Sequence, residues 1–144
     1  MALKDTFGVD RNKSDNGVWI VVDVDDEGKE VRFKISHMSP SNKKLTKLNA
    51  EVHKPYRRLG NNMSDELTDK LAREVFVKGV LLDWENVVVK KGEPPLEFSY
   101  DNAIMLFKEL PTLLDLLALT ASDFQNFKGD ADAAKNSQAF LPTN

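Results

Sequence analysis

The sequence predicts an α+β fold that is mostly helical, with an N-terminal β-hairpin packed on about four or five helices. Apolar and polar residues alternate within residues 18–36, and apolar residues recur at helical spacing through much of the remaining chain. The length of 144 residues is sufficient for one ordinary core. Because the chain contains no cysteine, that core must form without disulfides or cysteine-bound metal.

The hairpin is the clearest local feature of the sequence. Residues 18–24 are mostly β-branched or aromatic, and residues 25–29 are typical of a turn, with Gly28 suited to a positive φ. Residues 31–35 then alternate apolar and basic side chains. A single hairpin is marginally stable in water, so we expect its apolar face to pack on helices.

The next segment predicts an amphipathic helix with basic residues outside its apolar stripe. The stripe follows steps of three and four residues, which is the spacing of one helix face. Its members are Leu45, Leu48, Val52, Tyr56 and Leu59. Pro55 lies inside the stripe, so we expect the helix to kink or break there, and residues 60–62 end the element.

Further helices are predicted downstream. Ser64 is a candidate N-cap with two acidic residues in the following turn, where the helix dipole favours them. Residues 83–98 predict two short extended pieces around a Gly/Pro turn. Ser99 then caps a helix that ends before Pro111, and Pro111 suits the first turn of a last helix.

We expect one globular domain over residues 17–128 with a loose segment at each end. Residues 1–16 mix small polar and charged residues, which predicts a flexible N-terminal arm with the apolar side chains of Phe7 and Val9. Residues 129–144 show no sustained period and predict a mobile C-terminal tail.

No motif in the sequence indicates catalysis or a bound cofactor. His37 and His53 are 16 residues apart, and neither has a partner at metal-ligand spacing. Phosphate-binding loops, dinucleotide-binding glycine patterns and the Gly-x-Ser-x-Gly turn of hydrolases are absent from the sequence. We therefore expect no enzyme activity, no cofactor and no metal. No apolar run approaches the ~18 residues of a membrane-spanning helix, so we expect no membrane partner.

Charge is distributed unevenly along the chain. Residues 41–60 hold six basic residues and one acidic residue, a net charge of +5, whereas residues 97–132 hold seven acidic and two basic residues, a net charge of −5. This pattern fits nucleic-acid binding, association between copies, or simply solvated faces. An acidic pI of about 5.4 argues against nucleic acid as the partner. The basic residues are Lys43, Lys44, Lys47, Lys54, Arg57 and Arg58.

Five segments of the C-terminal half carry a family resemblance. In order they are Trp84-Glu85-Asn86-Val87, a glycine-containing turn at 91–95, residues 96–103, residues 110–113 and residues 121–127. This succession resembles the tail assembly chaperones of long-tailed bacteriophages, over about residues 30–137 and mainly after Trp84. The motif residues have structural interpretations: Trp84 and Phe98 as core anchors, Ser99 as a cap, and Phe124 and Phe127 on the buried face of the last helix.

The resemblance implies a protein that acts through surfaces rather than through an active site. It would coat and solubilise the tape measure protein, recruit major tail protein, work in the host cytoplasm and be absent from the mature virion. It would form a weak homo-oligomer, an open spiral or filament. A longer form made by ribosomal slippage would diverge near residues 129–144. The partner residues expected for association are Lys43, Lys47, Lys54, Arg57, Arg58, Phe7 and Val9.

Two alternatives to the chaperone remain open. One is a nucleic-acid-binding accessory protein that uses the basic helix over residues 43–58. The other is a structural phage connector subunit that is retained in the virion.

Overall fold

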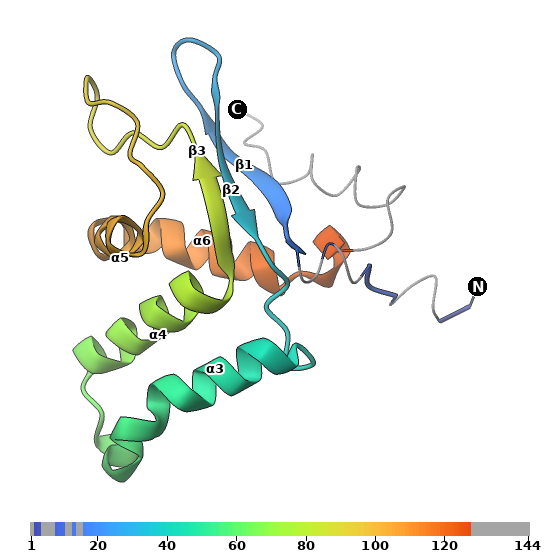
Figure 1. Cartoon of the computed structure of the whole chain (residues 1–144), viewed down its shortest axis with the longest axis vertical. Helices are drawn as coiled ribbons and strands as arrows, with labels where there is room; N and C mark the ends of the chain where they lie inside the picture. Colours follow the sequence, from blue (N-terminus) through green and yellow to red (C-terminus); the bar gives the residue numbers. More distant parts are fainter. Residues whose placement is uncertain (1, 4–7, 11–12, 14–15, 128–144) are drawn as a thin grey trace.

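The computed structural model describes residues 2–3, 8–10, 13 and 16–127 (Figure 1). In chain order the elements are β1 (Val18–Val24), β2 (Glu30–Ile35), α3 (Lys43–His53), the 3₁₀ segment η1 (Lys54–Asn62), α4 (Asp65–Gly79), β3 (Leu81–Glu85), α5 (Tyr100–Glu109), α6 (Pro111–Ser122) and the 3₁₀ segment η2 (Phe124–Phe127). The fold is thus α+β and mostly helical, as the sequence predicts.

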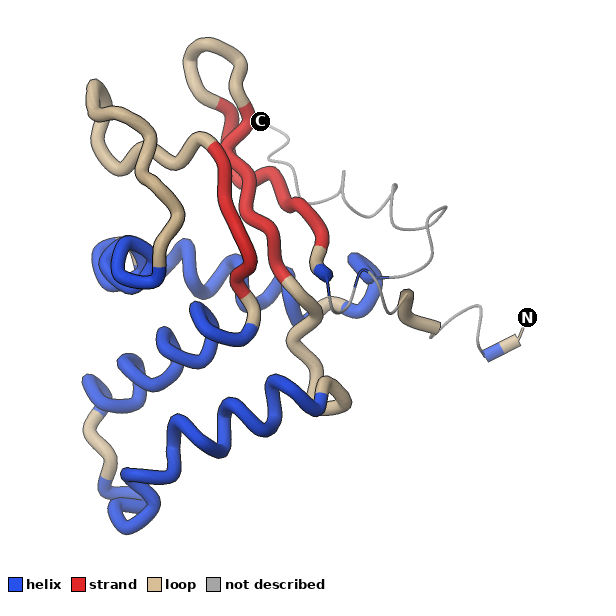
Figure 2. The backbone as a smooth tube through the Cα atoms, viewed as in Figure 1, coloured by secondary structure: helices blue, strands red, loops and turns tan. Residues whose placement is uncertain are grey.

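The sheet has three antiparallel strands in the order β1-β2-β3. The predicted hairpin forms its first two strands, with Ile20 opposite Phe33. The third strand was not expected, because the extended piece predicted near residue 83 had no assigned partner. It begins directly after α4 and places Trp84 opposite Phe33. Figure 2 shows the helices gathered at one end of the sheet, with the hairpin turn extending beyond them.

The hairpin turn is closed by the residue types that the sequence suggested. Gly28 adopts φ +83°, a backbone conformation that is sterically unfavourable for residues with a Cβ but not for glycine. The N–H of Asp25 donates to the carbonyl of Lys29 at 2.8 Å, and the N–H of Gly28 donates to the carbonyl of Asp25 at 3.0 Å. The turn therefore fixes the register of β1 and β2.

Helix α3 ends where the proline predicts. Asn42 caps its start by accepting a hydrogen bond from the N–H of Leu45 at 3.3 Å. The α-helix stops at His53, and Pro55 stands in the first turn of η1. The chain then turns at Gly60, which has φ +50°. This break gives the basic segment two parts, a helix and a tight 3₁₀ turn.

Helix α4 packs between α3 and α5. The Ser64 hydroxyl accepts from the N–H of Leu67 at 3.1 Å, which confirms Ser64 as the N-cap. At the other end, a Cβ on Gly79 would lie 2.7 Å from Leu48 Cδ2 and 2.9 Å from Leu45 Cδ1. Glycine therefore allows the leucines of α3 to lie directly on the last turn of α4, a role that the sequence analysis did not assign to it.

The last helix is shorter than the sequence predicts. It ends at Ser122, and Asp123 adopts an extended conformation before η2. The carbonyl of Thr120 accepts from the N–H of Asp123 at 3.2 Å and from the buried Asn126 amide at 2.9 Å. These bonds turn the chain, so Phe127 reaches the core from a separate 3₁₀ segment rather than from α6.

The core lies where the sheet meets the helices. Phe33 is its centre, with ring centroids 5.9 Å from Trp84 and 6.4 Å from Phe107. Phe107 also meets Phe76 of α4 edge-on at 5.6 Å. Aliphatic side chains from α5 and α6 complete the same cluster, among them Leu117. One continuous core thus joins the sheet to α4, α5 and α6.

Candidate interaction surfaces

The basic residues of α3 and η1 form an exposed surface, which we call the basic face. It consists of Lys43, Lys44, Lys47, Lys54, Arg57 and Arg58, all of them exposed. None of these side chains forms an ion pair with another residue in the part of the chain that the structure describes. Because Leu45 is buried against the core and η1 buries no residue, the cations occupy the solvent side of the segment.

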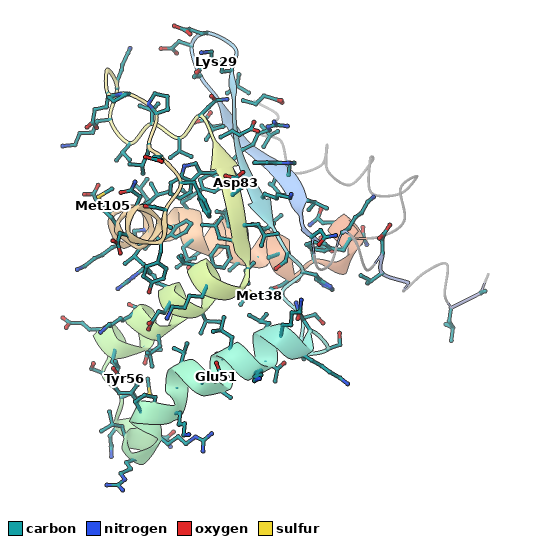
Figure 3. The ribbon with its side chains drawn as sticks, in the orientation of Figure 1. Lys29, Met38, Glu51, Tyr56, Asp83 and Met105 are labelled. Atoms are coloured by element: carbon teal, nitrogen blue, oxygen red, sulfur yellow. The ribbon has the colours of Figure 1, made fainter. Side chains whose placement is uncertain are left out.

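The basic face lies far from the hairpin turn along the longest axis of the molecule. Figure 3 labels Tyr56 in η1 at one end and Lys29 in the turn at the other. Glu51, also labelled, is the only acidic residue between positions 41 and 60. Since α4 separates α3 from α5, the acidic residues of the C-terminal helices do not neutralise the cations.

An acidic hollow lies on the other side of α4. It has a volume of about 320 Å³ and lies between α5 and the loop that follows β3. Three carboxylates line it, those of Glu93, Glu97 and Glu109, together with the apolar side chains of Leu96 and Met105. Lys90 is the one basic residue among the described residues of its lining. This hollow gives the negative C-terminal segment a defined concave surface.

A second hollow, which we call the α5–α6 groove, separates the hairpin from the junction of α5 and α6. It has a volume of about 390 Å³. Its lining is mostly apolar and consists of Val22, Asp23, Val31, Phe33, Val87, Val88, Leu106, Glu109, Leu110, Pro111, Thr112, Leu113 and Leu116. In Figure 1 the hairpin projects past the helices toward its turn.

Large apolar side chains around this groove are exposed. Leu110 is 42% exposed, Leu116 45% and Leu119, one helical turn further along α6, 71%. Scattered exposed leucines are common on protein surfaces, but Leu110 and Leu116 both line the groove, and Leu119 follows Leu116 on α6. The groove is not visible in the sequence pattern, because the leucines of the last helix form one apolar set whose faces the pattern does not separate.

The motif residues near Trp84 build one structural corner. Trp84 is 5% exposed, and its indole N–H donates to the carbonyl of Leu96 at 2.8 Å. Asn86 adopts φ +60°, and its side-chain amide donates to the carbonyl of Glu30 at 2.9 Å. The tryptophan thus anchors the loop to β3, and the asparagine ties the end of β3 to the start of β2.

Phe98 is not a core anchor, contrary to the sequence prediction. It is 36% exposed and meets Trp84 edge-on at a centroid distance of 5.0 Å. It packs on the outside of the tryptophan, one residue before Ser99, the N-cap of α5. The predicted cap is confirmed, since the Ser99 hydroxyl accepts from the N–H of Asn102 at 3.1 Å.

The predicted terminal segments are described only in part. Phe7 and residues 129–144 lie outside the described residues, as does the side chain of Phe124. Val9 is half-buried, and the N–H of the following Asp10 donates to the carbonyl of Phe127 at 2.8 Å. The backbone of Asp10 therefore contacts η2, and the flexible arm over residues 1–16 stays a prediction.

The two histidines have separate environments. His37 is buried and stacks on Phe127 with a centroid distance of 4.5 Å. Burial lowers the pKa of His37, and the carboxylate of Asp123 opposes that shift. His53 is instead bonded through Nδ1 to the carbonyl of Asn49 at 2.8 Å. Within the described residues no group of three or more metal-ligating side chains occurs, and no helix is long and apolar enough to cross a membrane.

The outer face of the sheet carries charges that the sequence analysis did not single out. Arg32 pairs with Glu85 across β2 and β3, and its guanidinium lies 4.9 Å from the ring centre of Trp19. The ammonium of Lys34 lies 5.9 Å from the same ring. These contacts satisfy the cations within the sheet, so this face offers less unpaired positive charge than the basic face.

Comparison with known proteins identifies the family of the chain. Residues 40–136 match the family described as YdaY prophage protein, which is about two thirds of the sequence. The chain therefore belongs to this family and is phage-derived. No curated protein matches it. No solved structure matches it either.

Proposed function

We propose that this prophage protein is a tail assembly chaperone that coats and solubilises the tape measure protein and recruits major tail protein, without catalysis. Its origin in a prophage family supports a phage role. The motif segment between Trp84 and residue 137 supports the finer assignment, through its resemblance to that chaperone family. On this proposal the protein works in the host cytoplasm and is absent from the mature virion.

The observation that carries the proposal is the set of exposed leucines at the α5–α6 junction and along α6. Leu110, Leu116 and Leu119 leave apolar area exposed to water beside an apolar groove, and a contiguous apolar surface of this kind is typical of a protein–protein contact site. Covering apolar area stabilises an association by roughly 25 cal/mol per Å² before the costs of ordering are subtracted. A protein that keeps an apolar client in solution requires such a surface.

Self-association through opposite charges is the second part of the proposal. The basic face and the acidic hollow lie on opposite sides of α4, so they cannot meet within one molecule. Each can meet the other on a neighbouring copy, and a contact between two different surfaces leaves both ends of the assembly open. Exposed ion pairs contribute only about 0–1 kcal/mol each, so the array would be weak and sensitive to salt.

Co-expression with the tape measure protein of the same prophage tests the chaperone role. We expect the tape measure protein to be soluble only when this chain is present. We expect mass spectrometry of purified virions to find no copies of this chain. A tape measure protein that stays insoluble would overturn the proposal. Abundant copies in mature particles would instead favour the connector subunit.

Nucleic-acid binding is the second candidate, and the unpaired basic face is the observation that favours it. Binding through phosphate contacts falls steeply as salt rises. A mobility-shift assay with DNA and RNA at ~150 mM salt separates the candidates. The chaperone assignment predicts no shift, whereas a shift removed by Arg57→Glu with Arg58→Glu would support the accessory protein.

A further inference from the structure

We propose that the α5–α6 groove binds an amphipathic helix of another protein, one with leucine-like side chains on one face and lysine or arginine beside them. Three features support this: the apolar lining, the leucines that extend it along α6, and the acidic side chains at its edge. As an account of how the client is held, the inference rests on the proposed function. As a statement about helix binding, it is tested independently.

The shape of the apolar surface favours a helix over a small molecule. Small ligands are largely enclosed by their pockets. Here Leu116 lines the hollow, while Leu119 lies outside it with 71% of its surface exposed. A ligand confined to the hollow would leave Leu119 in water. A helix covers both, because its side chains recur along one face at three- and four-residue steps.

Acidic side chains at the groove favour a basic partner. Asp23 from β1 and Glu109 from α5 line the hollow, and Asp115 stands on α6 beside Leu116 and Leu119. No lysine or arginine is present in the described lining, and none of the three carboxylates is paired with a described cation. Complementary charge would speed encounter and fix the orientation of the helix.

A second copy of this chain fits the groove less well. Its basic segment directs the apolar stripe of α3 toward α4, with Leu45 buried. The large apolar side chain left exposed on that segment is Leu59, at 41%. A lone leucine beside arginines would fill part of the hollow but would not cover Leu119. The groove therefore fits a helix with several apolar side chains in line.

Peptide binding tests the inference directly. The probe is a fluorescein-labelled synthetic helix of roughly five turns with leucine on one face and lysine on the other. One control peptide replaces every lysine by glutamate, and a second keeps the leucine and lysine composition in a scrambled order. Fluorescence anisotropy with the full chain should give affinity for the leucine–lysine helix at least about tenfold above either control.

Variants of the groove locate the site. Leu119→Asp should weaken binding at least about tenfold. Leu116→Asp should do the same, and its matched control is Leu59→Asp, since Leu59 is 41% exposed and Leu116 45%. Leu59 lies on the opposite side of α4, so Leu59→Asp should leave peptide affinity unchanged. Asp23→Asn combined with Glu109→Gln should weaken binding of the leucine–lysine helix about fivefold, because exposed charges contribute modestly to affinity.

Three results would overturn the inference. The first is equal binding of the scrambled peptide, and the second is loss of peptide binding in Leu59→Asp but not in Leu119→Asp. The third is that the wild type binds no peptide, whereas Leu119→Asp abolishes its self-association. The last result would assign the groove to contacts between copies. The proposed function fails separately: the peptide would bind at the groove while the tape measure protein stays insoluble. If Leu119→Asp loses peptide binding but solubilises the tape measure protein as well as the wild type does, the groove does not hold the client and the proposed function stands.

Discussion

The two helical regions on either side of α4 differ in what they bury and in what they expose. Helix α3 buries one residue, Leu45, and η1 buries none, and the α3–η1 region presents six cations and one carboxylate to solvent. In contrast, α5 and α6 each bury three residues in the common core, and their junction and α6 still expose leucines. The comparison suggests a division of roles, in which one region contributes charge and the other contributes both the core and apolar contact.

This difference has a physical consequence for stability. A helix held by few buried side chains gains little from packing, and isolated helices of this length are marginal in water. The α3–η1 region should therefore open locally at a lower free energy than α5–α6, whose side chains surround Phe33. Mutations in α5–α6 should therefore lower the free energy of unfolding more than comparable mutations in α3–η1.

The largest expected effect comes from emptying the core position of α5. Phe107 has no exposed surface and contacts Phe33 and Phe76, so Phe107→Ala should lower the free energy of unfolding by about 3–5 kcal/mol. Leu45→Ala in α3 should cost about 2 kcal/mol, because that site lies at the periphery of the core. Urea unfolding measures both, and an equal loss would contradict the division between the regions.

Helix caps give a smaller effect that compares the two regions at their starts. Asn42→Ala removes the cap of α3, and Ser99→Ala removes that of α5. Each should cost about 1 kcal/mol. Hydrogen exchange distinguishes them: the α3 amides should lose protection by local opening, whereas the α5 amides should follow global unfolding. If only the α5 amides lost protection by local opening, α5 rather than α3 would be the less stable helix.

His37 links the regions, since it follows β2, precedes α3 and stacks on Phe127 of η2. Its pKa in the folded protein is lowered by burial, so the unfolded chain binds a proton more readily near pH 6.5. The stability from this site is complete above pH 6.5 and decreases as the pH falls through the folded pKa. Between pH 7.5 and 5, the urea midpoint of His37→Gln should fall less than that of the wild type. If both midpoints fall equally, His37 does not cause the loss of stability at low pH.

Much of the fold follows from local sequence, and the exceptions have a common physical cause. The hairpin turn, the break at Pro55 and the caps at Ser64 and Ser99 depend on interactions within a few residues, so pattern and residue type suffice. The third strand depends instead on a partner some 50 residues earlier, as Trp84 lies opposite Phe33.

The same distinction separates the two candidate surfaces. The basic face is visible in the sequence because its cations lie within one segment of 16 residues, from Lys43 to Arg58. The α5–α6 groove combines the hairpin, the loop after β3 and two helices, and no local period reveals that assembly. Phe98 was misjudged for a related reason: its apolar character suggested burial, but the ring packs on the outer side of Trp84.

The smallest effect on stability for each residue changed, and the sharpest test of the division of roles, comes from reversing the charge of the basic face. Lys43, Lys47, Lys54 and Arg58 are exposed and unpaired among the described residues. Their replacement by glutamate should change the free energy of unfolding by less than about 0.5 kcal/mol for each residue. Self-association should nevertheless be lost, because the acidic hollow would then face negative charge on its neighbour.

Sedimentation of the wild type and of this fourfold variant at 50 and 500 mM salt measures the association. The wild type should sediment faster at the lower salt concentration and approach the monomer at the higher one, since screening acts over roughly 8–10 Å at ordinary ionic strength. The variant should be monomeric at both. Binding of the leucine–lysine helix should persist in the variant, because the α5–α6 groove lies on the other side of α4. If the wild type is monomeric throughout, or if the variant assembles as the wild type does, charge does not drive the array; the groove would then remain as the interaction surface of the molecule.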